Sequence, residues 1–179
     1  MLSININVSE QWDPKNNEFI SNNITLQLEH SLVSISKWES KWHIPFISAK
    51  EKTLEQTLDY IKCMTLNDVP DEVYSSLSSA NMKEINDYVS NSMTATWFND
   101  SKNTAKKNSE QVTSELIYYW MISLEIPFEC QYWHLNRLMT LIRICSIKNQ
   151  PSKKLSKKET LSRNAALNAA RRKRLGSSG

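Results

Sequence analysis

Glycine is nearly absent from this chain. Only two of its 179 residues are glycine, Gly176 and Gly179, and both lie within the last four positions. Phosphate-binding and dinucleotide-binding loops depend on glycine, because its backbone tolerates positive φ and the close approach of a ligand. The scarcity therefore excludes a P-loop and a Rossmann fingerprint, and any hairpin has to turn on Asn, Asp or Pro.

Cysteine and long apolar runs are also scarce. The three cysteines, Cys63, Cys130 and Cys145, are an odd number at wide spacing, which argues against a disulfide scaffold and fits a reducing cytoplasm. Charged or polar residues interrupt every apolar run well before it is long enough to span a bilayer. The first residues lack the basic and apolar segments of a signal peptide, so we expect neither a membrane span nor secretion.

Charge is distributed unevenly along the chain. Residues 1–149 contain 13 basic and 18 acidic side chains, for a net charge of −5. Residues 150–179 contain nine basic side chains and one acidic side chain, Glu159, for a net charge of +8. We therefore predict a compact, acidic domain over residues 1–149, followed by a basic tail over residues 150–179.

The N-terminal region has the pattern of a β-hairpin. Residues 3–8 and 23–28 alternate between polar and apolar side chains, which is the period of a half-buried strand. Residues 12–17, between them, are rich in turn formers. Because a two-stranded ribbon is marginally stable alone, we expect this antiparallel pair to dock on helices or on another subunit.

Helical patterns follow the hairpin. Leu32, Ile35, Trp38 and Trp42 recur at spacings of three and four, which predicts a short helix that stops near Pro45. Thr53 with Gln56 forms the signature of a capping box at the start of a second helix. A further helix is expected with Ser78 or Ser79 as its cap, and polar residues 99–110 are expected to form a surface loop. The fold class is thus mainly α with a small N-terminal antiparallel hairpin.

A helical hairpin around Pro127 gives the strongest signal. Its first helix is expected to begin at Asn108 or Ser109, and its second to run from about Phe128 to Lys148. The apolar residues of the first helix are Val112, Leu116, Tyr119, Trp120 and Leu124. Those of the second are Phe128, Tyr132, Leu135, Met139 and Ile142, with Leu138, Leu141 and Ile144 beside them. A helix that is apolar over most of its perimeter is a core helix or a subunit-contact helix.

The basic tail is also predicted to be helical. Ser156 with Glu159 forms a second capping-box pattern, and residues 164–170 have high helix propensity. Four consecutive basic residues, Arg171, Arg172, Lys173 and Arg174, end this helix. They suit a nucleic-acid arm, a segment that docks on an acidic partner or on the acidic domain, or a solvated tail. The lack of aromatic side chains for stacking on bases disfavours the first.

Few groups of side chains in the sequence could support metal binding or catalysis. Cys130 and His134 would share one face of a helix, which is the geometry of half a zinc site. No second pair has ligand spacing, so a half-buried histidine is the favoured interpretation. The same two residues lack the orienting third group and the glycine-bearing oxyanion loop of a nucleophilic pair. We therefore expect no metal, no cofactor and no catalysis.

Binding through aromatic and basic side chains is the remaining hypothesis. Four tryptophans, Trp38, Trp42, Trp120 and Trp133, occur at helical spacing and suit either the core or an assembly interface. The candidate partner-binding residues are Trp120, Trp133, Leu135, Met139, Arg171, Arg172, Lys173 and Arg174.

Four stretches are informative when they are taken together: Leu28–Trp42, Met93–Phe98, Glu115–Met121 through Ile126–Gln131 to Trp133–Leu138, and the tail Arg163–Arg172. Together they resemble a family of small proteins that tailed bacteriophages encode in the structural and tail-assembly part of the genome. The resemblance extends over most of the chain, from Leu28 to Arg172.

Within that family, the size and helical character are most similar to those of the tail assembly chaperones. The resemblance implies a protein that acts in the host bacterial cytoplasm and binds the tape-measure protein until the tail tube polymerises around it. The alternative is a structural virion component, such as a head–tail connector, tail or baseplate protein, that assembles through its strands and basic tail. Self-association as an oligomer is compatible with either role, whereas nucleic acid is the less favoured partner.

Overall fold

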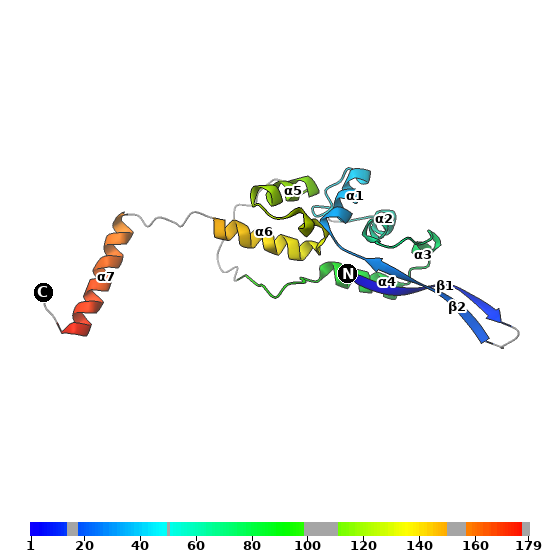
Figure 1. Cartoon of the computed structure of the whole chain (residues 1–179), viewed down its shortest axis with the longest axis horizontal. Helices are drawn as coiled ribbons and strands as arrows, with labels where there is room; N and C mark the ends of the chain where they lie inside the picture. Colours follow the sequence, from blue (N-terminus) through cyan, green and yellow to red (C-terminus); the bar gives the residue numbers. More distant parts are fainter. Residues whose placement is uncertain (14–17, 50, 99–110, 150–156, 177–179) are drawn as a thin grey trace. The chain divides into compact units, whose positions relative to one another are not determined.

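The computed structural model describes residues 1–13, 18–49, 51–98, 111–149 and 157–176. These residues form a two-stranded antiparallel sheet, seven α-helices and a short 3-10 helix (Figure 1). In chain order the elements are β1 (Leu2–Asp13), β2 (Glu18–Leu28), α1 (Leu32–Trp42), α2 (Leu54–Met64), α3 (Glu72–Ser75), α4 (Ser79–Ser90), α5 (Ser114–Ser123), η1 (Phe128–Tyr132), α6 (Leu135–Asn149) and α7 (Lys157–Leu175). The predicted fold class is confirmed. The chain divides into two compact units, Met1–Ser146 and Ile147–Gly179.

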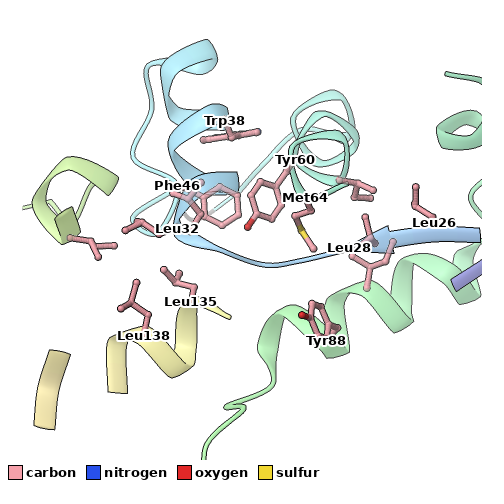
Figure 2. Packing of buried hydrophobic residues seen from close by; sticks show 14 of the residues in the cluster. Leu26, Leu28, Leu32, Trp38, Phe46, Tyr60, Met64, Tyr88, Leu135 and Leu138 are labelled. Atoms are coloured by element: carbon pink, nitrogen blue, oxygen red, sulfur yellow. The ribbon is translucent and has the colours of Figure 1, made fainter. Parts of the chain in front are cut away.

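The N-terminal hairpin is longer than the sequence pattern indicates. Its register runs from Leu2 opposite Leu28 to Asp13 opposite Glu18, with a β-bulge near Asn7. The alternation places one face of the ribbon in the core, where its buried members are Ile4, Ile6, Leu26 and Leu28. The ribbon docks on helices of the same chain: β1 packs against α4, and the end of β2 lies between α2 and α4 (Figure 2). The predicted turn falls largely on residues 14–17, outside the described residues.

Backbone hydrogen bonds join the end of β2 to two distant parts of the first unit. On one side, Glu29 N donates to Met64 O at 2.9 Å and Leu66 N donates to Gln27 O at 2.9 Å. On the other side, Leu135 N donates to His30 O at 2.7 Å. The segment 27–31 therefore connects the hairpin to the end of α2 and to the start of α6.

Aromatic side chains from α1, α2 and the loop between them fill the centre of the core (Figure 2). Trp38 is fully buried, and its indole Nε1 donates to Gln56 O at 2.9 Å. The Phe46 ring lies edge-on to Trp38, with 5.2 Å between ring centroids, and 4.1 Å from the Tyr60 ring. Core packing is therefore the role of Trp38, because its polar atom is satisfied and its ring has no solvent-facing surface.

The helix caps largely follow the sequence. Thr53 and Gln56 form the predicted capping box of α2, and Ser78 caps α4. The first helix stops before Pro45, as expected: it ends at Trp42, because His43 adopts a left-handed conformation with φ 53° and closes the helix.

The predicted start of the second helix of the helical hairpin, at about Phe128, is wrong. Residues Phe128–Tyr132 form the 3-10 helix η1, and α6 begins only at Leu135. Trp133 between them is extended, with ψ 160°, because Ser31 and His134 form a β-bridge. A tertiary backbone pairing thus overrides the helical propensity of this stretch.

The first helix of that hairpin is rotated relative to the prediction. It begins at Ser114 with Thr113 as its cap, so its start is not at Asn108 or Ser109, which lie outside the described residues. Its buried residues are Ser114, Ile117 and Met121, whereas Tyr119, one of the apolar residues of the predicted helix, is exposed. The buried carboxylate of Glu39 fixes the rotation by accepting hydrogen bonds from Ser114 N and Phe46 N, both at 2.7 Å.

Replacing Leu135 with Ala is expected to lower the free energy of unfolding by about 2–5 kcal/mol, because the side chain is 4% exposed and its removal leaves a cavity. Leu54→Ala is the matched control, since Leu54 is 71% exposed in α2, and its effect should stay within about 0.5 kcal/mol. Urea unfolding of both variants measures the difference. Equal stabilities would show that Leu135 contributes nothing to the core.

Candidate partner-binding surface

Five titratable side chains meet inside the first unit. The rings of His30 and His134 lie edge-on, 5.0 Å apart between centroids. Nδ1 of His30 shares a hydrogen bond of 2.5 Å with the Tyr60 hydroxyl, and the Tyr88 hydroxyl donates to Glu29 Oε1 at 2.6 Å. A partner for His30 could not be predicted from the sequence, because its neighbours come from α2, from α4 and from the start of α6.

Burial keeps the two histidines and the two tyrosines of this group neutral. It lowers the pKa of His30 from 6.5 to about 3, and a positive charge on His134 would lower it further. Burial also lowers the pKa of His134, although a hydrogen bond to the Tyr88 carbonyl opposes that shift. The pKa values of Tyr60 and Tyr88 are raised, again mainly by burial.

The hydrogen bonds of His134 assign it a structural role. Its Nε2 donates to Tyr88 O at 3.1 Å, while its Nδ1 accepts from Asn136 N at 3.3 Å, as a helix N-cap does. Both ring nitrogens are thus engaged in a neutral tautomer, and neither has a lone pair free for a metal. Cys130 is buried, and burial raises the pKa of its thiol. Across the described residues, no three His, Cys, Asp or Glu side chains form a group that suits a metal ion.

Acid is expected to destabilise the first unit between pH 7 and pH 5. A histidine whose pKa is lowered by folding binds its proton only in the unfolded state over this interval, so stability falls as the pH drops below about 6.5. The loss of unfolding free energy approaches about 1.4 kcal/mol per pH unit for His30, and the lowered pKa of His134 acts in the same direction. Melting temperatures measured across this range should fall for the wild type and for His43→Asn, which alters an exposed histidine.

His30→Gln should flatten that pH dependence, because it removes one of the two buried titrating groups. A wild-type melting temperature that stays constant from pH 7 to pH 5 would contradict the burial of neutral histidines, whether or not the variant folds.

The surface of the first unit exposes large apolar side chains over α5 and η1. Tyr119 and Ile122 on α5 are 62% and 61% exposed, and Phe128 and Tyr132 of η1 are 52% and 63% exposed. Isolated exposed apolar residues are ordinary, whereas a contiguous group of them marks an interaction site.

Tyr118 connects the two elements into one surface. Its ring stacks on Phe128, with 6.4 Å between centroids at an interplanar angle of 28°, and its hydroxyl donates to Gln131 Oε1 at 2.9 Å. Tyr132 is also near, because its charge contributes to the raised pKa of Tyr118. We call the group of Tyr118, Tyr119, Ile122, Phe128 and Tyr132 the α5–η1 surface.

The core beneath α5 and η1 holds this surface in place. Both elements pack against α1. Ile117 and Met121 anchor the opposite face of α5 in the core, and Ile126 N donates to Met121 O at 2.8 Å at the turn that leads to η1. A partner would therefore meet a preformed surface.

The predicted partner-binding residues of the first unit are mostly inside it. Leu135 is buried, while Trp120, Trp133 and Met139 are partly buried and pack against the core. Arg137 lies over the Trp133 ring, with its guanidinium carbon 4.1 Å from the ring centroid. In the sequence, Tyr119, Phe128 and Tyr132 are among the apolar residues of the two predicted helices, and the apolar face with Phe128 and Tyr132 suits either the core or a subunit contact. The sequence does not single out Tyr118 and Ile122 as binding residues.

The second unit contains the other predicted residues. Arg171, Arg172, Lys173 and Arg174 are exposed at the end of α7, as is every residue of this helix whose exposure the structure describes. Its largest apolar residues are Leu161, Leu167 and Leu175. The predicted cap at Ser156 and the side chain of Glu159 lie outside the described residues.

No helix within the described part of the chain has the length and hydropathy needed to cross a membrane. Comparisons of the chain with family models, with curated proteins and with solved structures found no match. The relationship to tailed-phage assembly proteins therefore stays a prediction.

Proposed function

We propose that this chain is a phage morphogenesis protein, a tail assembly chaperone that binds the tape-measure protein while the tail is built. The observation that supports the proposal is the α5–η1 surface, a group of exposed aromatic and aliphatic side chains on elements that pack against the core. A chaperone of this kind has to cover apolar helical surface on its client, and this surface offers matching apolar area. The resemblance in sequence supplies the identity of the client.

The size of the side chains suits a binding role. Burying one large apolar side chain contributes about 1.5–3 kcal/mol. The four exposed side chains can therefore contribute a large part of the roughly 4–15 kcal/mol that association costs in translational and rotational freedom. Tyrosine is also enriched among the residues that dominate binding energy, because it combines a large apolar ring with a polar group and few rotatable bonds. The α5–η1 surface contains three tyrosines.

Co-expression with the tape-measure protein tests the proposal. The wild-type chain should keep the client in the soluble fraction, and Tyr119→Ala combined with Ile122→Ala should abolish most of this effect. Both side chains are exposed, so the double variant should retain the melting temperature of the wild type.

Leu66→Ala is the control for these variants, because it truncates an aliphatic side chain of similar exposure, 59%, at the end of α2. Its rescue of the client should equal that of the wild type. A client that stays insoluble with the wild-type chain would refute the chaperone role.

A structural role in the virion is the second candidate, and the hairpin favours it. Strands of 12 and 11 residues pair only with each other over most of their described length, so each keeps an outer edge to which a neighbouring subunit can add a strand. Mass spectrometry of purified virions separates the two roles. A structural component would be present at a fixed copy number, whereas a chaperone should be absent from the finished particle.

A further inference from the structure

Charge on the α5–η1 surface narrows the chemistry of its partner. Three exposed carboxylates, Glu115, Glu125 and Glu129, lie on the same two elements and the turn between them, and residues 111–136 contain no Lys or Arg. The surface is therefore apolar with acidic groups beside it. We infer that its occupant is a basic amphipathic helix of a partner protein, an inference that rests on the binding role proposed above.

The position of Glu115 links this charge to the apolar side chains. Glu115, Tyr119 and Ile122 are at positions i, i+4 and i+7 of α5, so they follow one face of the helix, and all three are exposed. Hydrogen bonds at the helix N-terminus, from the residue's own backbone N–H and from the Thr113 side chain, lower the pKa of the Glu115 carboxyl. The carboxylate is thus ionised at neutral pH beside the residues that would bury the partner.

The other two carboxylates extend the acidic rim towards η1. Glu129 is adjacent to Phe128, and Glu125 lies in the turn after α5, where its φ is 54°. The first cation along the chain after this region is Arg137, whose guanidinium stacks on Trp133. An occupant with Lys or Arg beside its apolar stripe gains attraction from this rim, whereas an acidic peptide or a nucleic acid is repelled.

The shape of the surface favours a helical occupant. The apolar groups project from a helix face and a 3-10 turn, and a partner helix presents side chains at i, i+3, i+4 and i+7 that pack between such groups. A second copy of the chain is disfavoured at this surface. A two-fold contact would place the same patch on both sides and so bring its carboxylates together.

Three fluorescently labelled helical peptides that share the same apolar pattern test the inference. The positions that flank the apolar residues are Lys in the first peptide, Gln in the second and Glu in the third. The affinity of each peptide for the full chain is measured by fluorescence anisotropy. The basic peptide should bind about tenfold more tightly than the acidic one at low salt, and raising the salt to 0.5 M should remove most of the difference. The Tyr119→Ala and Ile122→Ala double variant should lose binding of all three peptides.

Glu115→Gln combined with Glu129→Gln should weaken the basic peptide about threefold to tenfold and leave the Gln peptide unchanged. Glu72→Gln combined with Glu84→Gln is the matched control, because it removes two exposed carboxylates from α3 and α4 without effect on either peptide.

The outcomes separate this inference from the proposed function. Equal affinity for the three peptides would overturn the inferred preference for a basic partner. The inference would also be overturned if the chain keeps the tape-measure protein soluble but binds none of the three peptides. Self-association of the chain that Ile122→Asp abolishes, measured by sedimentation, would make a second copy the occupant and would also overturn it. Failure of the co-expression rescue, with selective binding of the basic peptide intact, would refute only the chaperone role.

Discussion

The first unit depends on the backbone pairing of one short segment, residues 27–31. This segment leaves the hairpin and hydrogen-bonds to the end of α2 on one side and to the start of α6 on the other. Elements more than 100 residues apart in the sequence are thereby held together at His30 and Leu135. Because a buried backbone group without a partner costs about as much as a lost hydrogen bond, each of these pairings constrains where the helices begin and end.

The exposed surface follows from the same constraint. The bridge between Ser31 and His134 forces the chain to extend at Trp133, which separates η1 from α6. Without that break, a continuous helix would carry Phe128 and Tyr132 in line with Leu135, as the sequence pattern predicts. With it, Leu135 is buried whereas both aromatic residues are exposed beside α5.

Polar groups have opposite functions inside and outside the first unit. In the interior, His30, His134 and Tyr60 are held neutral, and no buried side-chain nitrogen or oxygen within the described residues lacks a hydrogen-bond partner. Glu39 joins the start of α5 to the loop after α1, because its carboxylate accepts hydrogen bonds from Ser114 N and from Phe46 N. On the outside, Glu115 and Glu129 are accessible on the same elements as the exposed apolar side chains, and the proposed recognition of a basic partner rests on this combination.

The sequence by itself determined the local elements. Period-two alternation predicted the hairpin, and side-chain oxygens at Thr53 and Ser78 predicted two helix starts, because strand pleating and capping act over a few residues. Tertiary structure alone decided the rotation of α5, the break before α6 and therefore the exposure of Tyr119 and Phe128. These features depend on Glu39, on His30 and on other groups far away along the chain. Local periodicity carries no information about such long-range hydrogen bonds. Where an apolar pattern allows either of two faces of a helix to be buried, tertiary packing decides which face is buried.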